Sequence, residues 1–416
     1  MTTTQSSVVH DLGTLAHRLS HPARTPCVCE PPQVLADRPD GTVVRSGAIV
    51  AKAHAADTDR EALAARVALA AAPQLAGILL PPLTAPAPAA PTARPVTLWP
   101  LGAPVDPTDP GAAPWAEAAG LLARLHRTKP PFPLPPMRGP AKAARAVARM
   151  RAALDEGGTT LPGDAAFPPR HTPPVSGGAA IAPGDVNPAP GRVFPAAGDR
   201  AALPGVGAVL PGDAAPLPGD VAPLRGVGAV LPSDAAPRVC DAASLPRDPV
   251  GEVRDPAALA VLAGWRALPA WARGEAPAPI SEALCHGDLH LGQLVRHPAP
   301  GGPWLLIDMD DAGMGDPAWD LGRPAAWYAA GLLAPEDWST FLDAYRSAGG
   351  PAVPADGDPW PALDVPARAL TVQTAAVALA KCAAEQRDPD EHELLMIESC
   401  ARIATLPPEL AAGPAS

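Results

Sequence analysis

The stretch LCHGDLHLGQL, residues 284–294, places several chemically reactive side chains in one short loop between apolar ends. His286, Gly287 and Asp288 are consecutive, and His290 and Gln293 follow within five residues of Asp288. A structural turn needs few groups of this kind. The loop therefore indicates a reactive site, and the sequence around it indicates what chemistry that site performs.

A second acidic loop follows closely, in the stretch IDMDDAGMGDPAWDLG that begins at Ile307. The apolar run before Asp308 and the run beginning at Gln293 predict two short strands joined by a turn. A hairpin of this kind would bring Asp288 and Asp308 together at one rim. Paired carboxylates at a rim suit divalent cations with oxygen ligands, especially magnesium that carries phosphates.

The N-terminal part has the pattern of a small sheet. QVLADRPDGTVVRSGAIVAKAH, residues 33–54, predicts a hairpin turning at Asp40 and Gly41, then a third strand that ends near Lys52. DTDREALAARVALAA, residues 57–71, predicts a helix of strong helix formers. PVTLWP, residues 95–100, predicts a further strand, and residues 114–127 predict an amphipathic helix.

Lys52 on a separate strand could neutralise the phosphates, and Glu61, nine residues later, could orient that lysine. Thr58 and Glu61 also have the spacing of a capping box, in which Glu61 would only satisfy the start of the helix. Both interpretations of Glu61 remain open from the sequence.

The chain has 60 Pro and 37 Gly in 416 residues, and their density peaks between residues 157 and 248. This segment contains GVGAVLPGDAAP from residue 205 and GVGAVLPSDAAP from residue 226. A fixed period can mark a solenoid. Two good copies with this much proline are, however, poor material for helices or central strands. We expect a disordered, recently duplicated insert.

Composition also limits the partners. The net charge is −11, which argues against nucleic acid. The six cysteines form no CxxC pair, so neither a zinc site nor a disulfide framework is supported. The N-terminus lacks an apolar core of signal-peptide length, and no membrane-spanning run occurs. We expect a cytoplasmic monomer or homodimer with no membrane partner.

The two acidic loops resemble the aminoglycoside phosphotransferase family of the protein-kinase-like fold. HGDLHLGQ is similar to that family's HGDxxxxN loop, and the stretch from Ile307 is similar to its second motif. The resemblance implies an α+β, bilobal fold with a small β-rich N-lobe and a larger, mainly helical C-lobe. It implies the division 1–100 as nucleotide-binding lobe, 101–156 as first part of the C-lobe, 157–248 as insert, and 249–410 as C-lobe with the catalytic and metal loops.

The resemblance also implies an activity: transfer of the γ-phosphate of ATP or GTP, with Mg²⁺, to a hydroxyl of a small molecule. Asp288 would then be the catalytic base. Gln293 and Asp308 would bind the metal ion. Lys52 would hold the phosphates, with Glu61 as its partner. These roles suit phosphoryl transfer, which depends mostly on positioning and charge neutralisation.

Some residues depart from the family pattern. Gln293 replaces the usual Asn, a form similar to the bacterial maltokinase branch, and its extra methylene would shift the amide. No glycine-rich loop precedes Lys52, so Gly41 at the hairpin turn must serve. His286 would brace the catalytic loop, and Asp316 and Asp320 would hold the second loop.

The acceptor remains open. From residue 336 to the end the chain has 13 Asp and Glu against 5 Lys and Arg, which favours a polycationic acceptor of the aminoglycoside type. The run EQRDPDEHE, residues 385–393, could equally be a solvated turn. A sugar kinase of the maltokinase type and a nucleotide-binding pseudokinase that recruits a partner are the alternatives. The complete set of Lys52, Asp288, Gln293 and Asp308 disfavours the pseudokinase.

Overall fold

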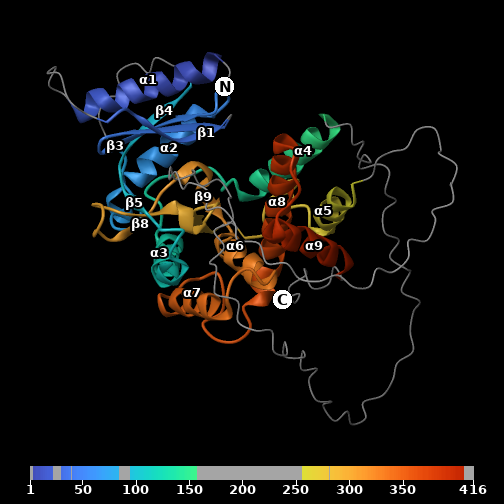
Figure 1. Cartoon of the computed structure of the whole chain (residues 1–416). Coiled ribbons are helices and arrows are strands. Elements are labelled where there is room, and N and C mark those ends of the chain that lie inside the picture. The colour runs from blue at the N-terminus through green and yellow to red at the C-terminus, as the bar shows by residue number, and fades with distance from the viewer. Residues whose placement is uncertain are drawn as a thin grey trace, which may run out of the picture.

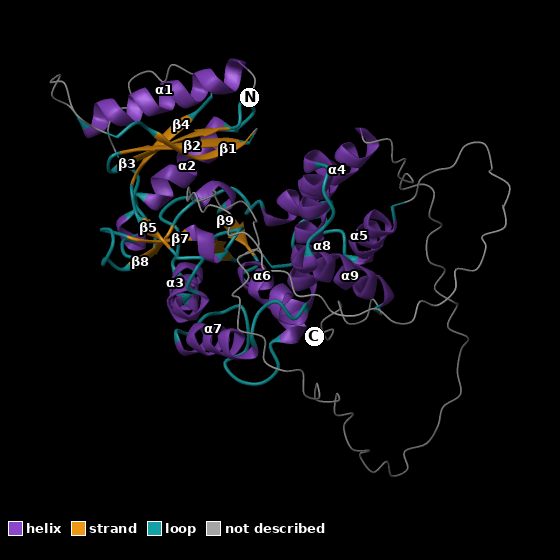
Figure 2. Ribbon diagram, in the orientation of Figure 1, coloured by secondary structure: helices purple, strands orange, loops and turns teal. Residues whose placement is uncertain are grey.

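The N-terminal part of the chain is a four-stranded antiparallel sheet with a helix on one face (Figures 1 and 2). The computed structural model describes residues 3–21, 30–38, 40–83, 94–156, 255–280 and 282–406. The sheet has the order β1-β2-β3-β4. Its strands are β1 (Gln33–Arg38), β2 (Gly41–Ser46), β3 (Ile49–His54) and β4 (Val96–Pro100).

The predicted hairpin, third strand and fourth strand of this sheet are all present. Arg38 pairs with Gly41 across the tight turn, and Lys52 lies within β3, paired with Val43 on one side and Thr97 on the other. Because both neighbours are hydrogen-bonded strands, the backbone of Lys52 has little freedom. The sheet thus fixes where this lysine side chain begins.

Two helices enclose the sheet region. Helix α1 (Thr3–Ser20) packs on β2 and β3 through apolar residues that include Leu12, Leu15 and Ala16. Helix α2 (Arg60–Ala70) connects the sheet to the rest of the molecule and lies between them in Figure 1. Helix α2 was predicted from the sequence, whereas α1 was not.

The rest of the described chain is mainly helical and contains the larger core. Helix α8 (Trp360–Glu385) packs against α4 (Gly139–Glu156), α5 (Pro256–Ala267), α6 (Ala318–Ala329) and α9 (Glu391–Thr405). Helix α3 (Trp115–Arg127) packs against α7 (Pro335–Ser347). The α+β fold with a small sheet lobe and a larger helical lobe is therefore confirmed.

Short strands between the lobes carry the two acidic loops. Strand β7 (Leu294–Arg296) lies between β5 (Ala103–Pro104) and β8 (Trp304–Leu306), antiparallel to both. Strand β6 (Ala283–Cys285) pairs with β9 (Gly313–Gly315). The predicted hairpin of β7 and β8 is thus present, and β6 with β9 joins the first loop to the second.

The predicted insert, residues 157–248, lies outside the described residues, as do both copies of its repeat. The predicted domain boundaries therefore stay predictions. Among the described helices, none is long and apolar enough to cross a membrane.

Candidate active site

The first loop begins where β6 ends, and Gly287 allows it to lie against the second loop. Gly287 has φ +85°, a region that residues with a Cβ rarely adopt. A Cβ at this position would also collide with the backbone of Asp311. Glycine is therefore required for two reasons, and the turn brings Asp288 and Asp311 into one small region.

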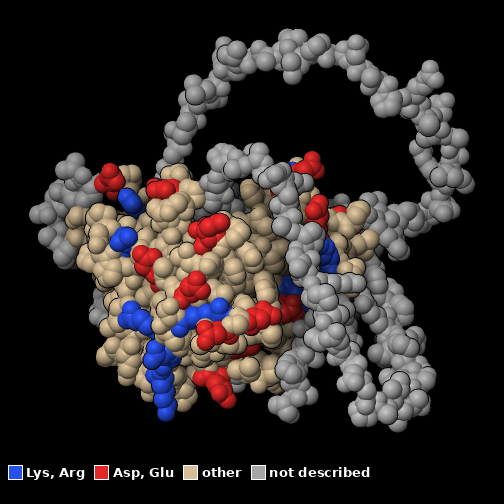
Figure 3. Space-filling model, turned by 90° about the horizontal axis from the view of Figure 1, so that it is seen from below, with Lys and Arg blue, Asp and Glu red and all other residues tan. Residues whose placement is uncertain are grey.

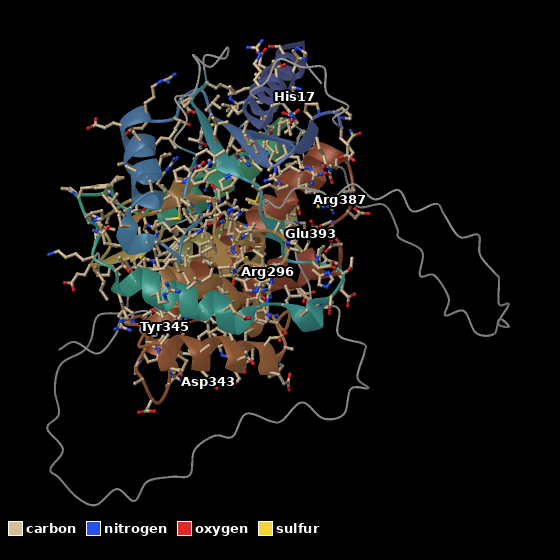
Figure 4. All side chains as sticks on the ribbon, turned by 90° about the vertical axis from the view of Figure 1, so that its left-hand side faces the viewer. His17, Arg296, Asp343, Tyr345, Arg387 and Glu393 are labelled. Carbon is tan, nitrogen blue, oxygen red and sulfur yellow. The ribbon has the colours of Figure 1, made fainter. Side chains whose placement is uncertain are left out.

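Asp320 of α6 holds this first loop in place. Its carboxylate accepts hydrogen bonds from the backbone N–H groups of His286 at 2.6 Å and Gly287 at 2.7 Å. The ring of His126 lies 3.0 Å from the same carboxylate, and its other nitrogen lies 2.7 Å from the hydroxyl of Tyr345. Tyr345 of α7, labelled in Figure 4, thus links α7 to the loop through α3.

This arrangement refines two sequence predictions. Asp320 was expected to hold the second loop, but its carboxylate binds the first. His286 was expected to brace the catalytic loop, and its Nε2 lies 2.8 Å from the carbonyl oxygen of Ile307, which spans the two loops. A bracing position fits His286 better than a reactive one.

Asp288 is 7% exposed and is held by two cations. Arg323 of α6 donates to one carboxylate oxygen at 2.7 Å, and Lys142 of α4 donates to the other. Burial alone would raise the pKa of Asp288, but Lys142 and Arg323 together lower it below its usual value. The carboxylate is therefore ionised at neutral pH and can accept a hydrogen bond from a hydroxyl.

Asp308 follows β8 with φ +60° and ψ +68°, in the left-handed region. Lys52 reaches it from the sheet, with Nζ 2.7 Å from Asp308 and 3.0 Å from Asp310. Burial would lower the pKa of Lys52, but the two carboxylates raise it above its usual value. A non-glycine residue in this conformation marks a site that the surrounding structure holds under strain.

Asp310 was not predicted as a site residue. It also lies 3.0 Å from Nδ1 of His54, and Nε2 of His54 lies 2.8 Å from the hydroxyl of Thr97 on β4. Burial would raise the pKa of Asp310, but Lys52 and His54 lower it. The second loop is therefore tied to two adjacent strands of the sheet.

Among the described residues, Lys52 does not pair with Glu61 as predicted. It pairs with Asp308 and Asp310 instead. The side chain of Glu61 is exposed in the first turn of α2. The predicted capping box is also wrong, because the helix is capped by Asp59, which accepts from the backbone of Glu61 and Ala62. Glu61 is thus an exposed residue of the first turn of α2, and Asp59 caps the helix.

A different residue of α2 reaches the loops. Arg66 is 4% exposed and donates from Nε to the carbonyl oxygen of Ala312 at 2.7 Å. Its side chain extends from α2 to the second loop. Arg66 therefore joins α2 to the second loop, a contact that was not predicted from the sequence.

Gln293 lies directly beside the second loop. Its backbone carbonyl accepts from the N–H of Ile307 at 2.9 Å, and its side chain is 5% exposed. The amide nitrogen lies 3.2 Å from Nε2 of His290. The amide oxygen is the atom of this side chain that a cation would bind.

A comparison with protein families places this geometry in context. Residues 217–363 match the model of the phosphotransferase enzyme family. The matched segment covers less than half of the chain. The family predicted from the two acidic loops is thereby confirmed, since both loops fall within the matched residues.

Solved structures give further similarities, and no curated protein sequence matches the chain. A choline/ethanolamine kinase family protein from Mesorhizobium loti is 15% identical, with 99% of each chain covered and a TM-score of 0.42. The choline kinase LicA from Streptococcus pneumoniae is 10% identical, with 97% of this chain and 99% of that chain covered and a TM-score of 0.45. A spectinomycin phosphotransferase in complex with ADP and spectinomycin is 10% identical, with 92% of each covered and a TM-score of 0.41.

Sequence reasoning missed the basic side of this phosphotransferase site. Lys142 and Arg323 both contact Asp288, yet neither lies in a recognisable motif. The one available signal was the spacing of Arg138, Lys142 and Arg145, which fall on one face of a helix. That spacing does not tell which part of the molecule the face contacts.

The acidic run 385–393 forms the turn between α8 and α9 of the phosphotransferase. Glu393 caps α9 with Asp390 and receives two hydrogen bonds from Arg387, each 2.7 Å long. Arg387 also binds Glu385 at 2.8 Å, and Figure 4 labels Arg387 and Glu393 near one another. On the face seen in Figure 3, acidic and basic side chains are interspersed. Two carboxylates of this acidic run, those of Glu385 and Glu393, are therefore paired with Arg387 within the turn.

Proposed function

We propose that this phosphotransferase moves the γ-phosphate of ATP or GTP to a hydroxyl of a small molecule. The observation that carries the proposal is that Lys52, more than 200 residues away in sequence, contacts Asp308 in the second acidic loop, against which the loop of Asp288 lies. Lys52 contacts Asp308 at 2.7 Å, and the loop of Asp288 lies against Asp311 of the same second loop. These side chains provide a cation for phosphates, a carboxylate for a metal ion and a carboxylate for a hydroxyl.

The residues at the Lys52 end fit a magnesium nucleotide. Lys52 would exchange contacts with Asp308 and Asp310 for contacts with phosphate oxygens. The carboxylates of Asp308 and Asp310 and the amide oxygen of Gln293 are oxygen donors, which Mg²⁺ prefers. Bound there, the metal ion would neutralise phosphate charge. Gln293 lies beside the second loop, because its backbone carbonyl accepts from the N–H of Ile307 at 2.9 Å.

Asp288 would position the acceptor. The hydroxyl donates a hydrogen bond to the Asp288 carboxylate, and its oxygen attacks the γ-phosphorus. The bond between that phosphorus and the oxygen bridging it to the β-phosphorus breaks, the nucleoside diphosphate leaves, and the hydroxyl proton passes to Asp288. A lowered pKa makes Asp288 a weak base, so its main effect is orientation, with proton transfer late in the reaction.

The acceptor class predicted from charge was an aminoglycoside-like polycation, and the alternatives were a sugar and the non-enzymatic pseudokinase. Arg387 occupies two of the carboxylates of the 385–393 run, Glu385 and Glu393, which weakens the basis for the polycation. The pairing of Lys52 with Asp308, and the contact between the loop of Asp288 and the second loop, support an enzyme over a pseudokinase. Residence in the cytoplasm as a monomer or homodimer remains part of the proposal.

The test is a screen of nucleoside-triphosphate turnover with Mg²⁺ against panels of aminoglycosides, macrolides, sugars and hydroxy acids. We expect at least one acceptor to raise turnover well above the rate without acceptor. Asp288→Asn should abolish that increase, whereas Asp343→Asn, on the surface of α7, should retain it. An increase that survives in Asp288→Asn would refute the assignment of Asp288.

A further inference from the structure

Helix α4 presents a row of basic residues to the two acidic loops. Arg138, just before the helix, and Lys142, Arg145 and Arg149 within it are spaced so that they share one face. Arg138 is anchored there because its backbone N–H donates to the carbonyl oxygen of Asp311 at 2.9 Å. Further along, Arg149 lies 3.3 Å from Asp40, at the turn between β1 and β2. The row therefore runs from the catalytic loops towards the hairpin of the sheet.

The cations at the loop end outnumber the carboxylates that they meet. Asp311 faces three of them, with Lys142 at 3.4 Å, Arg138 at 3.8 Å and Arg145 at 3.9 Å. The two arginine distances exceed hydrogen-bonding range. Arg138 and Arg145 thus gain Coulomb attraction from Asp311 without hydrogen bonds to it.

Asp288 adds only one further carboxylate and a fourth cation. It is shared between Lys142 and Arg323. Among the described residues, the buried Nε of Arg323 has no hydrogen-bond partner. Four cations therefore gather around two carboxylates, and one of them, Arg323, keeps a buried N–H donor without a hydrogen-bond partner among the described residues.

Repulsion between these neighbouring cations costs free energy, and the fold itself does not require them to lie together. Burial and the nearby charge of Arg138 both lower the pKa of Arg145, and burial followed by Arg138 does the same for Arg66. The side chains of Arg138 and Arg145 are 41% and 48% exposed. They could turn into solvent, yet both guanidinium groups lie beside Asp311. A concentrated positive site of this kind attracts anions.

The catalytic loop provides no cation of its own. Between His286 and Gln293 the sequence has no Lys or Arg. Among the described residues, the lysine and arginine that pair with Asp288 are Lys142 of α4 and Arg323 of α6, so a phosphoryl group in transfer, or an acid group on the acceptor next to the reacting hydroxyl, would meet positive charge from these helices. The basic row therefore lies where an anionic group of either kind would be bound.

We propose that Arg138, Lys142 and Arg145 form an oxyanion subsite beside Asp288, which binds a phosphate or carboxylate group during the reaction. The inference rests on the proposed function, because it places the subsite at the acceptor side of that site. Two sources share this chemistry: the terminal phosphate of the nucleotide and an acid group of the acceptor. Guanidinium groups bind both through paired hydrogen bonds.

Equilibrium binding distinguishes the two sources without requiring turnover. The titrants are the Mg²⁺ complexes of ADP and of a non-hydrolysable ATP analogue, and inorganic phosphate added to the protein saturated with Mg²⁺ and ADP. The variant is Arg138→Gln with Arg145→Gln. The matched control is Arg124→Gln with Arg402→Gln, which removes two exposed helix arginines from α3 and α9. Melting temperatures check that both proteins are folded.

If the nucleotide is the source, the variant loses about 10-fold to 100-fold in affinity for the ATP analogue and little for ADP. If an acceptor acid group is the source, both nucleotides bind unchanged, and inorganic phosphate binds the wild type and the control but not the variant. Equal behaviour of variant and control with all three ligands would overturn the subsite. A wild type that binds neither nucleotide would instead refute the proposed function.

Discussion

The two ends of the candidate active site have opposite charge balances. At the sheet end, Lys52 meets two carboxylates, Asp308 and Asp310, at 2.7 and 3.0 Å. At the helical end, four cations, Arg138, Lys142, Arg145 and Arg323, surround the two carboxylates of Asp288 and Asp311. The first end suits a metal ion with its phosphates, and the second suits an oxyanion. Under the proposed function, the metal ion would bind at the sheet end, and the reacting groups would lie at the helical end.

The largest expected effect comes from breaking the helical end at Asp288. We expect Asp288→Asn to lower turnover by about 10² to 10⁴-fold, the usual range for a general base. Binding of the magnesium nucleotide should change little, because Lys52 and Asp308 lie at the other end. Single-turnover kinetics and nucleotide titration measure the two separately.

The Asp288→Asn substitution also changes the contacts of a buried arginine, so the folding of the variant has to be checked. It leaves Arg323, whose side chain is 6% exposed, facing a neutral group. Activity should therefore be compared below the onset of unfolding of the variant, as determined by its thermal melt. Unchanged turnover in a folded Asp288→Asn protein would rule out the role of this carboxylate.

The next largest effect tests the residue that positions the first loop. Asp320 is 1% exposed and binds His286, Gly287 and His126. We expect Asp320→Asn to lower the free energy of unfolding by about 3 kcal/mol, because it breaks a buried charged network. Denaturant titration measures this. Asp343→Asn, at the position labelled in Figure 4, should stay within about 0.5 kcal/mol of the wild type. An equally small loss for Asp320→Asn would mean that the loop is held by other contacts.

Lys52 tests the sheet end. Lys52→Met should weaken binding of the magnesium nucleotide about 10-fold to 100-fold, since it removes charge-assisted hydrogen bonds to phosphates. Glu61→Gln is the informative comparison, because Glu61 is exposed and does not contact Lys52 in the described structure. Titration should show binding within about two-fold of the wild type for Glu61→Gln. A large loss in that variant would restore the pair predicted from the sequence.

The smallest effect concerns the turn between α8 and α9, away from both ends. Hydrogen bonds from Arg387 lower the pKa of Glu393 from 4.5 to about 2. A lowered pKa in the folded state stabilises the protein above the unfolded pKa, and this stabilisation is lost as pH falls towards 2. The wild type should therefore melt above Glu393→Gln at pH 6, with the gap closing below about pH 4. A gap that is independent of pH would contradict this assignment.

The sequence predicted most of the sheet end and little of the helical end. Strands and turns have local signals, so the position of Lys52 on β3 and of Asp308 after β8 followed from short stretches. The pairing of Glu61 with Lys52 was wrong: Lys52 contacts Asp308 and Asp310, and the cap of α2 falls on Asp59 instead of Thr58. A local sequence pattern does not define the position of a helix cap to within one residue.

The helical end depends on tertiary packing, which a local pattern does not contain. Lys142 approaches Asp288 because residues 137 and 138 hydrogen-bond to the second loop and because α4 packs on α8. Arg323 approaches it because α6 follows the second loop directly. A basic helix face predicts a charged surface, but only the fold shows that this surface faces the carboxylate of Asp288.

The central claim is that Asp288 and the residues around it pass a phosphate from a nucleotide to a hydroxyl. The most direct measurement follows the label from a γ-³²P nucleoside triphosphate, with Mg²⁺ and the best acceptor of the panel, in wild type and Asp288→Asn. We predict labelled phosphate ester on the acceptor with the wild type and only a small fraction of it with the variant. Label released solely as inorganic phosphate, at the same rate in both proteins, would contradict the claim.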